Sequence, residues 1–325
     1  MYYDSDPQQI LEADPYVVEN FLAHSERLTL GEVRTQILLC VDERASANGY
    51  YSSDAADKHV YVNVPGAGIG FLSDDDILHI LAKSNGIIDI YAHRFCGWGA
   101  LLFNEFLENN EENEDFSGHR RVIQSISQAV YDEEFYKMYN IEPGEEGELL
   151  DEAGLFIANK YNDLVSGSIL EVDHEWEEFF QRAFVYGEAL NLKNRIQDYY
   201  ERAFTGGYQY LPDVLNINVL IDPLEGAPHK HIANAAVINC TSRSITSRFQ
   251  VDGADAFFAD VDDNNIQQVL DLIFKIMEGD HSDTSDTHHN AYVFCEGEGQ
   301  LKYLQGILQG LTGLNRNIFL YLIGD

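Results

Sequence analysis

Basic residues are scarce in this sequence: 20 lysines and arginines stand against 55 aspartates and glutamates, which gives a formal net charge of -35 at pH 7. Such an acidic surface repels the phosphates of nucleic acids and the anionic headgroups of lipids. We therefore expect neither nucleic acid nor a membrane as a partner. The acidity fits a salt-adapted protein and an ordinary acidic protein equally well, and the composition does not decide between them.

Long apolar runs and clustered cysteines are also missing. No stretch is long enough to cross a bilayer, and residues 1–15 have neither the basic start nor the apolar centre of a signal peptide. We therefore predict a cytoplasmic protein. In a reducing compartment, scattered thiols are more often buried residues or metal ligands than disulfides. The four cysteines form no CxxC pair and are Cys40, Cys96, Cys240 and Cys295.

Short apolar runs alternate with helical patterns in two regions of the chain. This order predicts an α/β fold, a mostly parallel sheet flanked by helices, because parallel strands are buried on both faces and are joined by helical crossovers. The expected strands are residues 35–42, 59–64 and 87–93, and then 214–222, 231–240, 290–297 and 317–324. The expected helices are residues 14–30, 73–86 and 99–108, and then 264–278 and 301–311.

These patterns divide the chain into three predicted parts. Residues 1–118 form an N-terminal helix and a metal-binding α/β half that ends in a charged break at 108–118. Residues 119–204 form a helical insert or connector, in which 175–204 reads as a long amphipathic helix. Residues 205–325 form a second α/β half.

The second half echoes the first, which predicts an internal duplication. The sequence ILLCVD at 37–42 resembles NVLID at 218–222, and IIDIYAHRFCGWGALL at 87–102 resembles NAYVFCEGEGQLKYL at 290–304. In this alignment the second copy keeps the fold and lacks the metal. Its counterparts of Cys40, His93 and Cys96 are Leu220, Phe294 and Gly297.

Two short motifs carry the chemistry: CVDER at 40–44 and HRFCG at 93–97. Each lies at the C-terminal end of a predicted strand, and open parallel sheets form their sites at the carboxyl ends of their strands. Two thiolates and one imidazole are donors that zinc prefers, and three protein ligands leave a fourth position for water or substrate. We therefore predict that Cys40, His93 and Cys96 bind Zn²⁺ at a catalytic site.

The pattern C-x-D-x-R, followed after about fifty residues by H-x-x-C-G, resembles the signature of the β-class carbonic anhydrases. The resemblance implies that Cys40, His93 and Cys96 hold zinc and that Asp42 and Arg44 form the catalytic dyad. Asp42 would accept a hydrogen bond from zinc-bound water while Arg44 holds its carboxylate. In an inactive form known in part of the family, the aspartate is itself the fourth ligand.

The resemblance covers about residues 30–110 and implies a lyase that hydrates carbon dioxide reversibly to bicarbonate and a proton. Because family members are dimers with sites near the subunit boundary, we expect a homo-oligomer or an intramolecular pseudo-dimer. His59 and His79 are candidate proton shuttles. Two alternatives stay open: a hydrolase of carbon disulfide or carbonyl sulfide, and a non-catalytic zinc-stabilised binding or scaffold module.

Some segments depart from the family pattern or read as structural. Residues 62–70, VNVPGAGIG, replace a segment that is often similar to RNAGN in the family, and Trp98 stands where a small residue is usual. Cys240 and Cys295 read as inert core residues. The histidine-containing segments read as solvated loops; they are residues 229–231 and 280–289.

Overall fold

The computed structural model describes two sheets with their flanking helices. The described residues are 15–29, 32–42, 44–45, 59–93, 96–99, 101–102, 174–222, 231–251, 253–262, 265–279, 282–284, 287–311 and 315–324. The charged break at 108–118 and the part of the predicted insert at 119–173 lie outside the described residues.

The first sheet has six strands in the order β1-β7-β3-β2-β4-β5. The neighbours β3, β2, β4 and β5 are parallel, whereas β7 pairs antiparallel with β3 and with β1 at one edge. β7 lies far in sequence from β1 and β3, the strands with which it pairs, so a distant segment completes this edge of the sheet. The strands are β1 (Ser25–Glu26), β2 (Arg34–Leu39), β3 (His59–Asn63), β4 (Ser84–His93), β5 (Asn216–Asp222) and β7 (Ser244–Ile245).

The second sheet has four parallel strands in the order β10-β9-β6-β8. In each sheet the parallel strands, numbered along the chain, stand in the order second, first, third, fourth. The α/β prediction is confirmed at this level: two sheets, one mixed and one parallel, flanked by helices. The strands are β6 (Ala235–Asn239), β8 (Phe257–Asp260), β9 (His289–Glu296) and β10 (Arg316–Ile323).

The strand at 216–222 corrects the predicted alignment of the two halves. β5 pairs with β4 over its whole length, so it is the fourth parallel strand of the first sheet and not the first strand of the second. The prediction was wrong because a short apolar run carries no signal of the strand that it will pair with. The domain boundaries themselves stay a prediction.

The ladders give the correct correspondence. Val64 N donates to Leu39 O at 2.9 Å, and Val261 N donates to Asn239 O at 3.1 Å, so Leu39 and Asn239 hold equivalent positions. The next residue in each case is a cysteine. Cys40 therefore corresponds to Cys240.

The strand register also changes the predicted counterparts of His93 and Cys96. Leu38 lies opposite Ile90, whereas Asn239 lies opposite Phe294, which makes Phe294 the equivalent of Tyr91. The counterpart of His93 is then Glu296, and the counterpart of Cys96 is Gly299.

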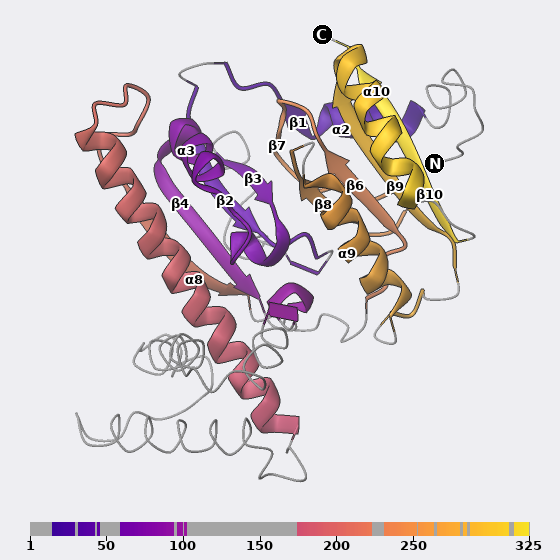
Figure 1. The fold of residues 1–325 in the computed structure, drawn as a ribbon, viewed down its shortest axis with the longest axis horizontal. Helices are drawn as coiled ribbons and strands as arrows, with labels where there is room; N and C mark the ends of the chain where they lie inside the picture. Colours follow the sequence, from indigo (N-terminus) through magenta and orange to yellow (C-terminus); the bar gives the residue numbers. More distant parts are fainter. Residues whose placement is uncertain are drawn as a thin grey trace.

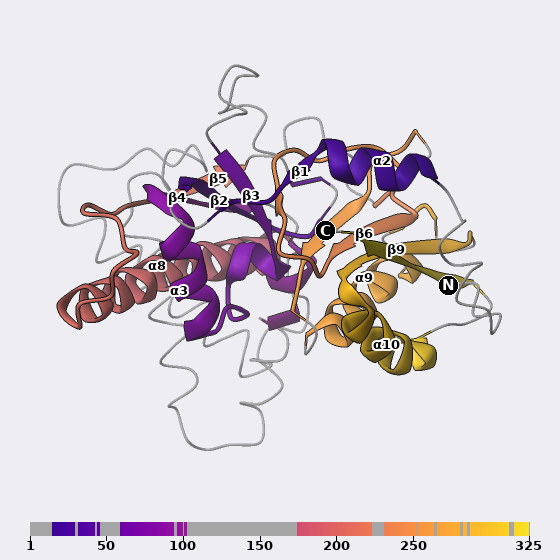
Figure 2. The same cartoon turned by 90° about the horizontal axis from the view of Figure 1, so that it is seen from above.

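Among the described helices, α2 (Pro15–Ala23) covers one side of the sheets, and the others lie on the opposite side (Figures 1 and 2). The expected helix at 73–86 begins with a capping box at Ser73, whose Oγ accepts from Asp76 N at 3.2 Å while the Asp76 carboxylate accepts from Ser73 N. None of the described helices combines the length and apolar character that a bilayer crossing requires. α2 (Pro15–Ala23) lies alone, and the others are α3 (Asp74–Lys83), α8 (His174–Thr205), α9 (Ile266–Glu278) and α10 (Gly297–Leu308), with short 3-10 turns η2 (Pro65–Gly68) and η3 (Gln309–Leu311).

Alternation along the strands divides the core between the two sides. Leu38 and Ile90 pack toward α3 and α8, whereas Ile37 and Tyr91 share a cluster with the second sheet and α2. There the ring of Phe21 in α2 stacks on Phe294 of β9 at 3.9 Å. Each fully buried side chain of this kind contributes about 1.5–3 kcal/mol. The two sheets are therefore joined by a shared apolar core.

Candidate metal centre

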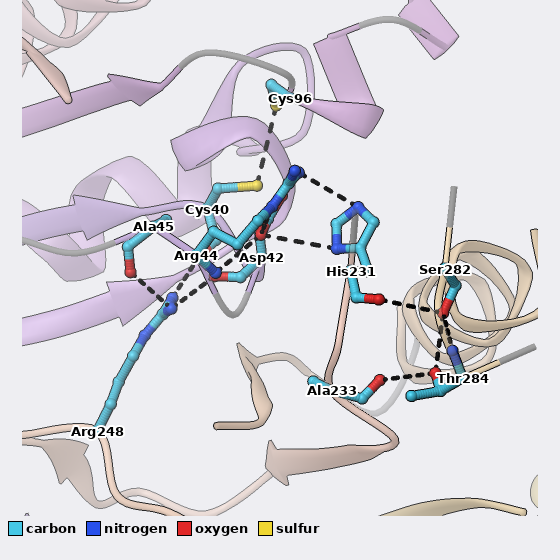
Figure 3. Close-up of polar contacts among 10 residues, drawn as sticks. All are labelled: Cys40, Asp42, Arg44, Ala45, Cys96, His231, Ala233, Arg248, Ser282 and Thr284. Carbon is cyan, nitrogen blue, oxygen red and sulfur yellow. Dashed lines mark hydrogen bonds and ion pairs between the residues drawn. The ribbon is translucent and has the colours of Figure 1, made fainter. Parts of the chain in front are cut away.

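The three predicted zinc ligands come together at the carboxyl edge of the first sheet. Cys40 directly follows β2, His93 ends the neighbouring strand β4, and Cys96 follows three residues later. Their ligand atoms all lie within 4.8 Å of one another, and the two sulfur atoms are 3.9 Å apart (Figure 3). All three side chains are buried. The structure thus confirms a buried Cys/His/Cys group that could hold a metal ion.

The spacing of the sulfur atoms matches chelation. Two sulfurs, each about 2.3 Å from one tetrahedral zinc ion, would be about 3.8 Å apart. The observed 3.9 Å agrees with that value and far exceeds the roughly 2.05 Å of a disulfide. The donor set of two thiolates and an imidazole also suits zinc. The residues therefore fit the ion that the sequence predicts.

The surroundings shift the pKa values of the two thiols in opposite directions. Burial opposes ionisation of Cys40, yet a hydrogen bond from Cys96 and the nearby His93 hold the pKa of Cys40 well below its usual range. The hydrogen bond to Cys40 and burial raise the pKa of Cys96, although Gly99 N donates to its sulfur at 3.4 Å. One thiolate is therefore favoured before any cation arrives, and metal binding would release the second proton.

Asp42 and Arg44 form a buried, doubly hydrogen-bonded pair beside this group. Arg44 Nε donates to Asp42 Oδ1 at 2.9 Å, and its Nη2 donates to Oδ2 at 2.7 Å. The Arg44 backbone N–H donates to Oδ1 at 2.9 Å as well. Burial raises the pKa of Asp42, but the hydrogen bonds from Arg44 and its positive charge act against this, so the pKa lies well below its usual range. Asp42 is therefore ionised and oriented, and it is not part of the Cys/His/Cys group.

Two residues of the second half reach this site, and neither was identified from the sequence. His231 was expected in a solvated loop, but only 6% of it is exposed and its Nε2 lies 3.2 Å from Arg44 Nη2. Arg248 donates to the carbonyl oxygens of Cys40, Asp42 and Ala45 (Figure 3). No local pattern could have revealed these contacts, because they join positions about 200 residues apart.

The two departures from the family pattern contact each other. Trp98 Nε1 donates to Ile69 O at 2.8 Å, and a Cβ added to Gly66 would lie 2.5 Å from Trp98 Cδ1. Gly66 has φ of 58°, which favours glycine, and the close contact with the ring leaves no space for a Cβ. The indole ring therefore packs against the glycine-rich turn as one unit.

The long helix α8, whose position agrees with the predicted amphipathic segment, supports the chain just after the ligands. A Cβ added to Gly99 would lie 2.3 Å from Cγ2 of Val185 on α8. The same Gly99 donates its N–H to the sulfur of Cys96. α8 thus fixes a residue that itself contacts a predicted ligand.

The structure also places the candidate proton shuttle His59, the other two cysteines and the segment 280–289. His59 begins β3 and lies opposite Thr35, at the amino end of β2, so it is at the edge away from Cys40 and is unsuited as a proton shuttle there. Cys240 and Cys295 are buried free thiols, as expected of core residues. In the segment 280–289, Ser282 is buried rather than solvated.

The corresponding edge of the second sheet opens into a cavity. Its volume is about 740 Å³, and Cys240 and Glu296 line it together with His79 and Lys83 of α3. His79 therefore faces this second edge, not the metal group. Among the described residues, Cys40, His93 and Cys96 are the one set that meets the geometric condition for a metal site.

Comparison of the chain with protein-family models, with curated proteins and with solved structures gave no match. The case for a function therefore depends on the geometry and chemistry of the site.

Proposed function

We propose that this protein is a zinc-dependent carbonic anhydrase of the β-class type, which converts carbon dioxide and water reversibly to bicarbonate and a proton. The observation that carries the proposal is the Cys/His/Cys group with the Asp42–Arg44 pair beside it. Zinc bound to three protein ligands keeps a fourth position for water and lowers the pKa of that water to about 7.

The Asp42–Arg44 pair is suited to orient the attacking water. Oδ2 of Asp42 accepts from Arg44 Nη2 on one side, and a carboxylate oxygen can accept a second hydrogen bond. Because its pKa is far below the usual range, Asp42 stays ionised and acts as an acceptor rather than as a proton carrier. The proton that bicarbonate formation releases then leaves through other groups or solvent.

The alternatives receive less support from the geometry. A structural zinc site has no need of an oriented carboxylate next to the ligands, yet Asp42 is buried and held by Arg44. For carbon disulfide or carbonyl sulfide, Trp98 would have to reshape the entrance to the site, but its ring packs on Gly66 and hydrogen-bonds to Ile69 O. Parallel assays of carbon dioxide and carbon disulfide turnover distinguish the two enzymes.

We further propose that the second half takes the place of a partner subunit, as a pseudo-dimer within one chain. The equal strand order of the two sheets and the addition of β7 to the first sheet support this arrangement. Light scattering combined with metal analysis should show a single chain with one zinc ion. Two zinc ions per chain would contradict a second half without metal.

The decisive experiment is stopped-flow carbon dioxide hydration on protein whose zinc content has been measured. We expect activity in the wild type, and in Asp42→Asn a loss of about 10²–10³-fold with zinc retained, because the amide cannot replace the charged acceptor. Asp74→Asn, an exposed aspartate paired with Arg195, is the matched control and should keep full activity. A fully active, zinc-loaded Asp42→Asn protein would show that the proposed mechanism is wrong.

A further inference from the structure

Arg248 holds the backbone of the loop that carries Cys40. Its Nη1 donates to Asp42 O at 2.6 Å and to Ala45 O at 2.9 Å, and its Nη2 donates to Cys40 O. Three carbonyl groups of one short loop therefore converge on a single guanidinium. The planar fork of arginine can serve several acceptors at once, which a lysine ammonium on a flexible stem does less well.

The guanidinium of Arg248 is itself fixed from the side away from the loop. Its Nε donates to Asn63 Oδ1 at 3.0 Å, and its planar group lies over the ring of Phe258 at 5.6 Å. Asn63 in turn donates to Asp260 Oδ2 through its backbone and side chain, at 2.8 and 2.9 Å. Asn63 and Asp260 end equivalent strands of the two sheets, so the arginine is anchored where the sheets meet.

His231 contacts the dyad from the opposite direction. Because an arginine can only donate, His231 Nε2 must accept the hydrogen bond from Arg44 Nη2 at 3.2 Å. The proton of the neutral ring then resides on Nδ1, which lies 3.9 Å from Asp42 Oδ1. The Nη2 group of Arg44, which donates to Asp42, is thereby also hydrogen-bonded to His231.

The backbone around His231 is held in turn by the segment at 282–284. Asp283 N donates to His231 O at 2.9 Å, and Thr284 Oγ1 donates to Ala233 O at 3.3 Å. Ser282 and Thr284 share a hydrogen bond of 2.8 Å between their hydroxyl groups (Figure 3). The imidazole ring also packs against Phe257 of β8 at 5.5 Å. The position of the ring is thus set by the second sheet.

We propose that Arg248 and His231, both from the second half of the chain, are positioning residues of the metal centre. Arg248 fixes the loop that presents Cys40, and His231 fixes the guanidinium that orients Asp42. This inference rests on the proposed zinc site, and it makes the first half incomplete without the second. Neither residue touches the reacting atoms, so each acts through a neighbour.

The test measures zinc affinity by chelator competition and the absorption spectrum of the cobalt-substituted protein, neither of which depends on turnover. We expect Arg248→Gln to weaken zinc binding about 10–100-fold, the range for residues that support metal ligands, and to change the cobalt spectrum. Arg248→Lys should recover part of the affinity. Arg316→Gln removes a partly buried arginine that begins β10 and pairs with Glu278, and it should leave both readouts unchanged.

His231 gives a separate readout. His231→Phe should keep wild-type zinc affinity and KM and lower kcat about 10-fold or more, because a small misplacement of the dyad slows the chemical step. His231→Gln retains an acceptor at similar reach and should restore most of kcat.

The outcomes separate this inference from the proposed function. A wild-type protein that binds no zinc overturns both. A wild type that binds zinc, with Arg248→Gln equal to it in affinity and cobalt spectrum, overturns the inference alone, and so does an equal loss in Arg316→Gln. If Arg248→Gln does not fold, the test depends on Arg248→Lys and on the two His231 variants. The inference is then refuted if Arg248→Lys has the zinc affinity and cobalt spectrum of the wild type and His231→Phe has its kcat.

Discussion

The carboxyl edges of the two sheets share one strand order but carry different chemistry. The first edge presents two buried thiols and an imidazole toward one point. At the second edge Cys240 stands at the position equivalent to Cys40, and Glu296 stands at the position equivalent to His93; its carboxylate accepts from Ser242 N at 3.1 Å and from Arg27 at 3.0 Å. The polar groups there are paired with the protein itself. The comparison shows that the strand order determines where a site can form, whereas the side chains at that edge determine its chemistry.

The largest expected effect contrasts the two equivalent cysteines. Cys40→Ser should lose zinc, with affinity reduced about 10³-fold or more, because a neutral hydroxyl replaces a thiolate ligand. Cys240→Ser should bind zinc like the wild type. Atomic absorption after dialysis against a weak chelator measures both. Equal zinc loss in the two variants would break the comparison, because it would place a metal at the second edge.

A smaller effect concerns the packing behind the first edge. Trp98→Ala should lower the free energy of unfolding by about 3–5 kcal/mol, because it leaves a cavity against Gly66 and removes the hydrogen bond to Ile69 O. Urea unfolding of both proteins measures the loss. Trp98→Phe keeps most of the ring contact and should lose less, and an equal loss in the two variants would argue against packing as the cause.

The smallest effect is a change in pH dependence where the sheets meet. Burial raises the pKa of Asp260, against the hydrogen bonds from Asn63 and Asn239 and the charge of Arg248. A carboxyl group with a raised folded-state pKa adds stability that is full below about pH 4, the unfolded value, and is lost as the pH rises through the folded value. The stability advantage of the wild type over Asp260→Asn should therefore shrink from acid to neutral pH. Urea unfolding in the presence of a chelator, between pH 3.5 and 7, measures it, and an advantage that grows with pH would contradict the assignment.

The local part of this structure could be predicted from the sequence. Apolar runs located β2, β3, β4, β9 and β10, the helical pattern at 73–86 located α3, and the two motifs located the Cys/His/Cys group. Each of these signals is contained in a few neighbouring residues.

The long-range part could not be predicted. The short strands β1, β7 and β8 have two to four residues, which is too short a run to identify a strand from its pattern. The membership of β5 depends on pairing with β4, and the roles of His231 and Arg248 depend on contacts across 187 and about 200 residues. A single sequence contains no local trace of such pairings.

The hydrogen bonds from Arg248 to the Cys40 loop have a consequence for biosynthesis. The residues bridged are 203 to 208 positions apart, so the ribosome must make most of the chain before that loop acquires its final shape. Contacts of such long sequence separation form slowly, since the loss of chain entropy precedes the gain. In a nascent amino-terminal segment, Cys40 and Cys96 would not yet have their final positions, and the proposed zinc ion would bind late in maturation.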